Sequence, residues 1–270
     1  MGQKSQGHLL IIGGAEDKTG KCEILRYFVQ AAGGEKARLV VVTTATREPE
    51  ATGETYQEVF GRLGVTEVDL LDVQDRPGAN SSGVEERLKQ ATGVFFTGGD
   101  QLRITSLIGG TLMDQILHKL YQKGVIIAGT SAGASMMSDT MIVEGASDDT
   151  PKKNTVKLAP GLGLLEETVI DQHFAQRGRI GRLLTAVAQN PFIIGIGIDE
   201  DTAIVVNQAG QFRVIGSQTV TVIDGRSIQY SNTSQVDPEQ PLALTDVILH
   251  VLPATYAYDL NARQPLIGKP

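Results

Sequence analysis

A serine flanked by small residues follows an apolar run in the middle of the chain. Residues 125–135 read VIIAGTSAGAS, with Ser131 between two glycines. In a Gly-x-Ser-x-Gly turn, small neighbours permit a sharp strand-to-helix bend that presents the serine hydroxyl at the end of the strand. This position suits nucleophilic attack on a carbonyl carbon. The competing interpretation is a turn in which Ser131 only caps the next helix. The buried strand before it favours the nucleophile.

Attack on a carbonyl also requires hydrogen-bond donors for the oxyanion that forms. The amide of Ala132, at the start of the helix after the serine, is one candidate. Residues 95–101, FFTGGDQ, provide another, because glycines after a strand let backbone amides approach a ligand. We expect Gly99 to be this second donor, with a simple turn capped by Asp100 as the open alternative. The related turn at 13–18, GGAEDK, lacks Gly-x-Gly-x-x-Gly spacing and does not indicate a dinucleotide site.

A serine nucleophile needs a general base, and the chain has only four histidines. His8 lies at the amino end of the first expected strand, His118 within an amphipathic segment and His250 in a late strand. His173 follows the apolar run VIDQ and precedes a basic segment. We therefore predict His173 as the base, because only this histidine combines a strand end with a dense polar cluster.

An imidazole base is oriented by an acceptor on its other nitrogen. Asp199, Glu200 and Asp201 end another apolar run and are the candidates. Alternation along a strand sends Glu200 to the opposite face from its neighbours. The residue pattern does not say which face meets His173, and a solvated acidic turn is an open alternative.

The elements that position these residues alternate in the first half of the chain. Continuously apolar strands separated by helices predict a parallel sheet covered on both faces, that is, a doubly wound α/β fold. The expected strands are 9–12, 38–43, 67–71, 93–97 and 124–128, and the expected helices are 21–32, 53–63, 84–90 and 113–122.

After about residue 190 the pattern changes to short strands joined by turns. The expected strands there are 192–198, 202–207, 212–215, 219–223 and 243–251, with a polar loop at 231–241. We expect them to add antiparallel strands to the same sheet. With no linker in between, residues 1–270 are predicted to form a single hydrolytic domain.

Composition excludes several classes of protein. The net charge is −7, tryptophan is absent and aromatic residues make up 5%, which disfavours nucleic-acid binding. The single cysteine, Cys22, leaves too few thiolates for an internal disulfide or a cysteine-rich metal site. No signal-peptide core and no apolar stretch of membrane-spanning length is present. We expect a cytoplasmic protein without a membrane anchor.

Together these features resemble the cyanophycinases, serine peptidases with a class I glutamine amidotransferase-like fold of flavodoxin-like type. The matching blocks are IIGGAEDK at 11–18, ATREP at 45–49, TGGDQLR at 97–103, GTSAGA at 129–134, DQHF at 171–174 and GIDEDT at 197–202. The resemblance implies a triad of Ser131, His173 and Glu200 and a homodimer that needs no metal or cofactor. It also implies cleavage of cyanophycin, a poly-aspartate with arginine on each side-chain carboxyl, to β-Asp-Arg dipeptides by exopeptidase action.

Such a substrate carries a guanidinium and a free carboxylate in each repeat, so its site should offer both charge signs. Arg179 and Arg182 share a face at helical spacing and suit a carboxylate, while Asp171 or Asp17 suits a guanidinium. A solvated basic helix is the open alternative. The candidate substrate-binding residues are Asp17, Asp100, Gln101, Asp171, Gln172, Arg177, Arg179 and Arg182.

Two other functions stay open at this point. An aspartyl dipeptidase of the same fold would cleave short peptides with free ends, and a non-catalytic homologue would bind the polymer without cutting it. A glutamine amidotransferase is disfavoured because the elbow carries serine and Cys22 lies in the first helix. An α/β-hydrolase esterase is disfavoured because its acid precedes its histidine in the chain.

Overall fold

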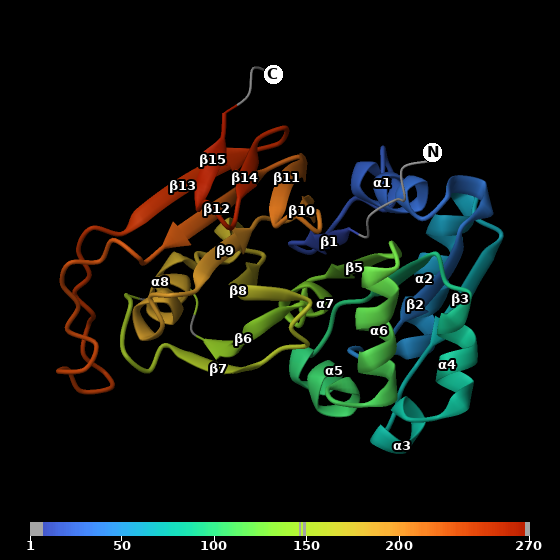
Figure 1. Cartoon of the computed structure of the whole chain (residues 1–270), viewed down its shortest axis with the longest axis horizontal. Helices are drawn as coiled ribbons and strands as arrows, with labels where there is room; N and C mark the ends of the chain where they lie inside the picture. Colours follow the sequence, from blue (N-terminus) through green and yellow to red (C-terminus); the bar gives the residue numbers. More distant parts are fainter. Residues whose placement is uncertain (1–7, 146, 148–149, 268–270) are drawn as a thin grey trace.

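The computed structural model describes residues 8–145, 147 and 150–267, which form two sheets lying side by side (Figure 1). The strands of the first sheet are, in spatial order, β15 (Gln264–Leu266), β14 (Ala257–Asp259), β11 (Gln211–Gly216), β10 (Thr202–Val206), β1 (Leu9–Ile12), β5 (Ile126–Thr130), β4 (Gly93–Phe96), β2 (Arg38–Val42) and β3 (Glu67–Leu71). The strands of the second are β13 (Ile248–Pro253), β12 (Thr219–Asp224), β9 (Ile194–Ile198), β8 (Leu165–Gln172), β6 (Ser138–Gly145) and β7 (Val156–Pro160).

Eight α-helices and two short 3₁₀ turns connect the strands in this part of the chain. The α-helices are α1 (Glu23–Ala31), α2 (Pro49–Arg62), α3 (Arg76–Ala79), α4 (Ser82–Lys89), α5 (Gln101–Ile108), α6 (Leu112–Gln122), α7 (Ala132–Ser135) and α8 (Ile180–Gln189). The 3₁₀ turns are η1 (Gly34–Lys36) and η2 (Ala175–Arg177). No helix among the described residues has the length and apolar composition that crossing a membrane requires.

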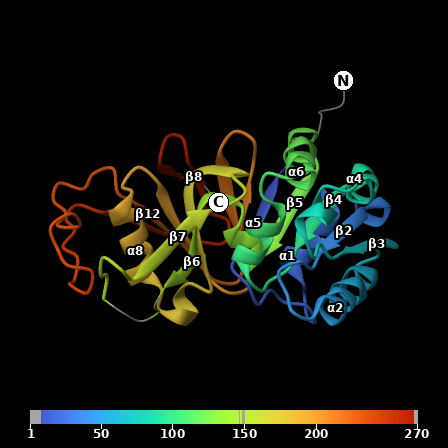
Figure 2. The same cartoon turned by 90° about the horizontal axis from the view of Figure 1, so that it is seen from below.

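Helices cover both faces of the parallel half of the first sheet. Successive side chains of a strand point to opposite faces, and β1 follows this rule. Leu9 and Ile11 pack in one core with α4, α5 and α6, whereas Leu10 and Ile12 pack in another with α1 and α2. Strands β1, β5, β4, β2 and β3 pair in parallel (Figure 2). The predicted doubly wound α/β class is confirmed.

The expectation that all late strands extend this sheet is wrong. Strands β10, β11, β14 and β15 do extend it in antiparallel pairs, but β9, β12 and β13 belong to the second sheet. The reason lies in the topology. Strand β5 already has β1 and β4 as neighbours, so the chain that leaves α7 as β6 finds no free edge beside it. It starts a new sheet, in which β6, β8 and β9 pair in parallel.

The two sheets share one hydrophobic core. Ile196, Val220 and Leu252 of the second sheet belong to the same buried cluster as Leu9 and Val94 of the first. The turn at 199–201 joins β9 to β10 and so carries the chain from one sheet to the other. The single domain over residues 1–270 stays a prediction.

Candidate active site

The backbone at Ser131 makes a sharp turn between β5 and α7. Its φ of 53° and ψ of −110° lie outside the regions that side chains ordinarily favour. The glycines on either side permit this bend, because a Cβ on Gly129 would overlap the carbonyl oxygen of Gly133. The amide of Ser131 donates to Ile12 O at 3.0 Å, which ties the turn to β1. The local geometry is that of a nucleophile elbow.

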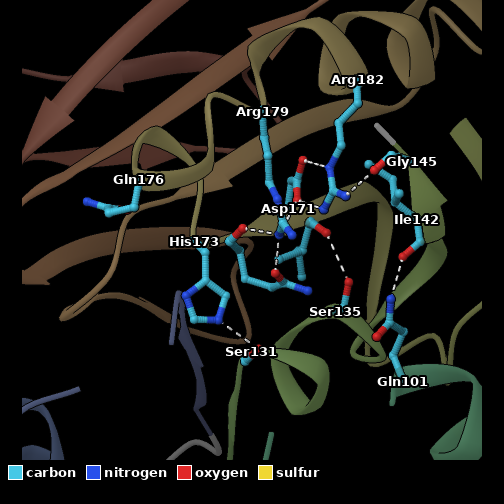
Figure 3. A network of polar contacts seen from close by, with 12 residues as sticks. Gln101, Ser131, Ser135, Ile142, Gly145, Asp171, His173, Gln176, Arg179 and Arg182 are labelled. Carbon is cyan, nitrogen blue, oxygen red and sulfur yellow. Dashed lines mark hydrogen bonds and ion pairs between the residues drawn. The ribbon is translucent and has the colours of Figure 1, made fainter. Parts of the chain in front are cut away.

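Ser131, His173 and Glu200 lie in one hydrogen-bonded chain. Ser131 Oγ is 3.0 Å from His173 Nε2, and His173 Nδ1 is 2.6 Å from Glu200 Oε1. An ionised carboxylate only accepts hydrogen bonds, so Nδ1 carries the proton and Nε2 accepts from the serine. Figure 3 shows the imidazole between the elbow and the turn that follows β8. Three segments that are distant in sequence thus converge on one point.

The electrostatic surroundings of His173 favour the neutral imidazole. Partial burial lowers its pKa below the ordinary value of 6.5, and the positive charges of Arg177 and Arg179 lower it further. The hydrogen bond to Glu200 acts in the opposite direction but does not outweigh burial. At neutral pH the ring is therefore able to accept a proton from Ser131.

The turn after β1 holds His173 in place. The histidine has a positive φ of 48°, and its backbone amide donates to Gly13 O at 2.7 Å. Gly14, at φ 100°, lies directly beneath the imidazole, where any Cβ would overlap the ring. The carbonyl oxygen of Gly14 accepts from the amide of Asp201, next to Glu200, at 2.9 Å. One turn therefore contacts the segments of both the histidine and the acid.

The same turn also reaches the nucleophile, through Glu16. Its side chain is almost completely buried and accepts from Thr130 Oγ1 and from Tyr56 Oη, each at 2.5 Å. Lys18 Nζ lies 2.8 Å from the carboxylate. Thr130 directly precedes Ser131, so this buried cluster holds the elbow from behind. Burial and the charge of Glu16 raise the pKa of Tyr56 well above its ordinary value, which keeps the phenol a donor.

The acidic turn at 199–201 is held by its side chains. Gln176 Oε1 accepts from the amide of Glu200 at 3.0 Å. Asp199 accepts from the amide of Ala175 and from the hydroxyl of Thr219. Of the three carboxylates, only that of Glu200 contacts the imidazole, whereas Asp199 and Asp201 accept from backbone amides. This resolves which acid faces His173.

The two candidate oxyanion donors lie beside the elbow. Gly98 packs against Ser131, since a Cβ added to this glycine would lie 3.4 Å from the Cβ of the serine. Gly99 follows it with a φ of 142°. Within the described residues, the amides of Gly99 and Ala132 donate to no other group. Both are therefore available to a bound ligand.

Asp171 does not offer the open carboxylate expected from the sequence. It is fully buried, and Arg182 donates to both of its oxygens, from Nε at 2.7 Å and from Nη2. Arg179 Nη1 lies 3.4 Å from the same carboxylate and also donates to the main chain and side chain of Gln172 (Figure 3). Direct pairing of Asp171 with a substrate guanidinium is thus wrong for this arrangement, because its own arginines occupy it.

The buried cluster keeps an excess of positive charge. Burial lowers the pKa of Arg179 to about 10, with Asp171 opposing the shift, so the guanidinium stays charged at neutral pH. Two guanidiniums thus face one carboxylate. Arg179 Nε, moreover, is buried without a hydrogen-bond partner among the described residues. Such a site attracts an anionic group.

The remaining substrate-binding candidates differ in availability. Arg177 is exposed, and its guanidinium forms no ion pair within the described residues. Gln101 Nε2 donates to Ile142 O at 2.8 Å, which fixes the side chain beside β6 (Figure 3). Asp100 accepts hydrogen bonds from the first amides of α5, so it caps this helix, as the alternative interpretation of the turn predicts. Asp17 accepts from three backbone amides of its own loop, which lower its pKa to about 2.

The other histidines take part in separate contacts. His118 Nε2 lies 2.9 Å from Leu162 O, within hydrogen-bond distance. His250 packs against the ring of Tyr258. Neither contacts Ser131.

Comparison with known proteins places this geometry in a family. Residues 9–215 match the family model described as peptidase family S51. The chain belongs to peptidase family S51. It is 41% identical over 260 residues to a cyanophycinase of Synechococcus elongatus, covering 96% of this chain and 81% of that protein. It is 40% identical to a cyanophycinase of Geminocystis herdmanii, over 99% of both chains.

A solved structure shares the fold. A peptidase from an acI-B1 Actinobacterium superposes with a TM-score of 0.65 at 23% identity, covering 91% of this chain and 98% of the other. Family membership identifies this S51 protein as a serine peptidase.

Sequence reasoning missed the residues that position the site in this S51 peptidase. Gly14 and Glu16 lie in a turn that the sequence pattern tested only as a dinucleotide site. The pattern assigned no function to Gln176. Nothing in the sequence pairs Glu16 with Thr130, which is 114 positions away.

We predict that Glu16→Gln slows the labelling of Ser131 by a fluorophosphonate about 100-fold. The amide offers one acceptor where the carboxylate offers two, so Thr130 or Tyr56 loses its partner and the elbow shifts. Labelling rates measured by intact-protein mass spectrometry check this. Thr185→Val removes a buried hydroxyl bond within α8 and serves as the control for general destabilisation. An equal loss of labelling in the control would contradict a positioning role.

We also predict that Arg177→Gln moves the acid limb of the labelling rate to higher pH. Reaction requires neutral His173, so the rate rises with pH through the histidine pKa, which lies below 6.5. Removing a positive charge that disfavours the imidazolium raises this pKa. Rate–pH profiles of both proteins test the direction. A limb that stays in place or moves to lower pH would show that Arg177 does not act on His173.

Proposed function

We propose that this S51 peptidase hydrolyses cyanophycin and releases β-Asp-Arg dipeptides. The observation that carries the proposal is 40–41% identity, over nearly the whole chain, to proteins named cyanophycinase. The hydrogen-bonded chain of Ser131, His173 and Glu200 supports it, because acyl transfer by a serine needs this arrangement.

In the first step, Ser131 Oγ attacks a main-chain aspartyl carbonyl while His173 Nε2 takes its proton. Glu200 stabilises the imidazolium through Nδ1–H. The negative charge that develops on the carbonyl oxygen is met by the amides of Ala132 and Gly99, both without internal partners among the described residues. Collapse of the tetrahedral intermediate breaks the C–N bond. His173 gives its proton to the leaving amine, and an acyl-enzyme ester remains.

In the second step, water attacks the ester as His173 accepts one of its protons. The second tetrahedral intermediate expels Ser131 Oγ, which recovers its proton from His173. The product leaves with a free carboxylate. Neither step requires a metal ion or cofactor to balance.

The charges near Ser131 fit the proposed substrate. Each repeat of cyanophycin presents the α-carboxylate of an arginine, and Arg177, in the turn after His173, is exposed and forms no ion pair with any residue that the structure describes. The buried pair of Arg179 and Arg182 adds positive charge behind it that Asp171 neutralises only in part. We assign Arg177 to direct substrate contact, Asp171 to holding the two arginines and Gln172 to holding Arg179.

We further propose a cytoplasmic homodimer. The buried free cysteine, Cys22, is compatible with a reducing compartment. Sedimentation equilibrium over a range of concentrations tests the dimer, and a mass of one chain at micromolar concentration would contradict it.

Ser131→Ala is expected to lower turnover by roughly six orders of magnitude if the three residues act as a unit. Ser135→Ala is the matched control, because Ser135 is a buried serine at the end of the helix that follows Ser131 and its hydroxyl donates to Ile170 O. It should keep nearly all activity. Release of free amines from cyanophycin measures both variants, and a loss below tenfold in Ser131→Ala would remove this serine from the mechanism.

The identity of the substrate is tested by incubation with purified cyanophycin, followed by mass spectrometry of the soluble fragments. β-Asp-Arg dipeptides are the expected product. Cleavage of Asp-Xaa dipeptides with the polymer left intact would indicate an aspartyl dipeptidase instead. Binding of the polymer without cleavage, together with no phosphonate labelling, would indicate a non-catalytic homologue.

A further inference from the structure

A cavity opens next to the active site, on the side away from His173. It encloses about 640 Å³ and is lined by the loop after β2, the turn after β4 and the exposed side of α5. Its wall includes Thr46, Arg47, Gly99, Arg103 and Leu107. None of these residues except Gly99 has a role in the chemistry described above.

Gly99 joins this cavity to the nucleophile. Ser131 ends β5, Gly98 and Gly99 follow β4, and Arg47 lies in the loop after β2. Strands β5, β4 and β2 are consecutive neighbours in the sheet (Figure 2). Adjacent strands lie about 4.8 Å apart, so the cavity begins at the turn after β4, one strand from Ser131, and the loop after β2 on its far side lies two strand spacings, roughly 10 Å, from Ser131. A substrate whose carbonyl oxygen is bound at the oxyanion donors passes the entrance of the cavity.

The cavity carries a positive charge excess. Arg103 is fixed by its Nε, which donates to Thr44 O at 2.7 Å, and its terminal nitrogens form no ion pair with a described residue. Arg47 is exposed and likewise has no ion-pair partner in the described ranges. Asp100 is the one carboxylate of the lining, and its Oδ1 accepts from the amides that begin α5. In a chain of net charge −7, two unpaired guanidiniums at one cavity form a local anion site.

From these contacts we infer that the cavity is a subsite for the α-carboxylate of an arginine on a repeat of the polymer beyond the two that flank the scissile bond. The inference rests on the proposed function. Guanidinium groups bind carboxylates through paired hydrogen bonds, and Leu102 and Leu107 offer apolar contact to the methylene chain of the same arginine. The two arginines disfavour a guanidinium in the same place. The subsite therefore binds the α-carboxylate of the arginine branch and does not bind its guanidinium.

The distance from Ser131 determines which substrates reach the subsite. An extended main chain advances about 3.5 Å per residue, so 10 Å corresponds to about three residues. A substrate of two repeats is too short to fill both positions, whereas a longer oligomer spans them. The cavity thus gives the enzyme a preference for polymer over its smallest fragments.

The test compares Arg47→Gln and Arg103→Gln with the parent on β-Asp-Arg oligomers of two and of six repeats. The expected result is a rise in KM of roughly tenfold on the six-repeat substrate, since one hydrogen bond to a charged group contributes about this much affinity. The value of kcat should change less than twofold, and the two-repeat substrate should be unaffected. Arg26→Gln is the matched control, because Arg26 also donates from Nε to a backbone carbonyl but lies in α1.

The outcomes separate this inference from the proposed function. If the parent releases β-Asp-Arg but both variants keep its KM on six repeats, the subsite is wrong and the function stands. If KM rises equally on both lengths, the arginines act at the scissile repeat and the subsite is wrong as well. If the parent cleaves no oligomer and no polymer, the proposed function is wrong, and the subsite inference, which rests on it, is wrong as well.

A direct binding measurement supplies a second readout. In a Ser131→Ala background, the six-repeat oligomer should bind about tenfold more weakly when Arg47 or Arg103 is replaced by glutamine. Added salt should weaken binding less in these variants, because fewer exposed charges take part. Equal affinity with and without the substitutions would overturn the proposal.

Discussion

The site depends on one short turn, residues 13–17, that follows the first strand. Its carbonyl oxygens accept from the backbone of the histidine segment and of the acid segment, and its Glu16 binds the threonine before the serine. Gly14 leaves room for the imidazole where any side chain would overlap it. Because β1 lies between β5 and β10, this turn is at the place where the two sheets meet. This turn thus contacts His173 and the residues next to Ser131 and Glu200.

Buried charge is arranged so that the histidine remains a base. Asp171 sits between Arg179 and Arg182, and this cluster lies behind the turn that bears His173. Burial is the main cause that lowers the pKa of the imidazole, and the positive charges of Arg177 and Arg179 lower it further. The same excess attracts the anionic group of a substrate. One electrostatic feature thus favours both proton transfer and binding.

The two positive regions lie on opposite sides of the nucleophile. The buried arginines lie toward the second sheet, and Arg47 and Arg103 lie toward the parallel strands of the first. A branched polymer with a carboxylate in every repeat matches such spacing better than a compact small molecule does. The carboxyl edge of the first sheet thus carries the nucleophile between two regions of positive charge.

The sequence alone determined the local elements and the chemistry-bearing residues. Alternating apolar runs specify strands and helices, and small residues around Ser131 specify the elbow, because both follow from contacts within a few positions. What only the tertiary structure decided was pairing. The late strands belong to two sheets because β5 has no free edge. Asp171 forms ion pairs with Arg179 and Arg182 and is not open to a substrate. Glu200 rather than its neighbours met His173 because the 199–201 turn crosses between sheets, a contact over 27 positions that residue pattern does not encode.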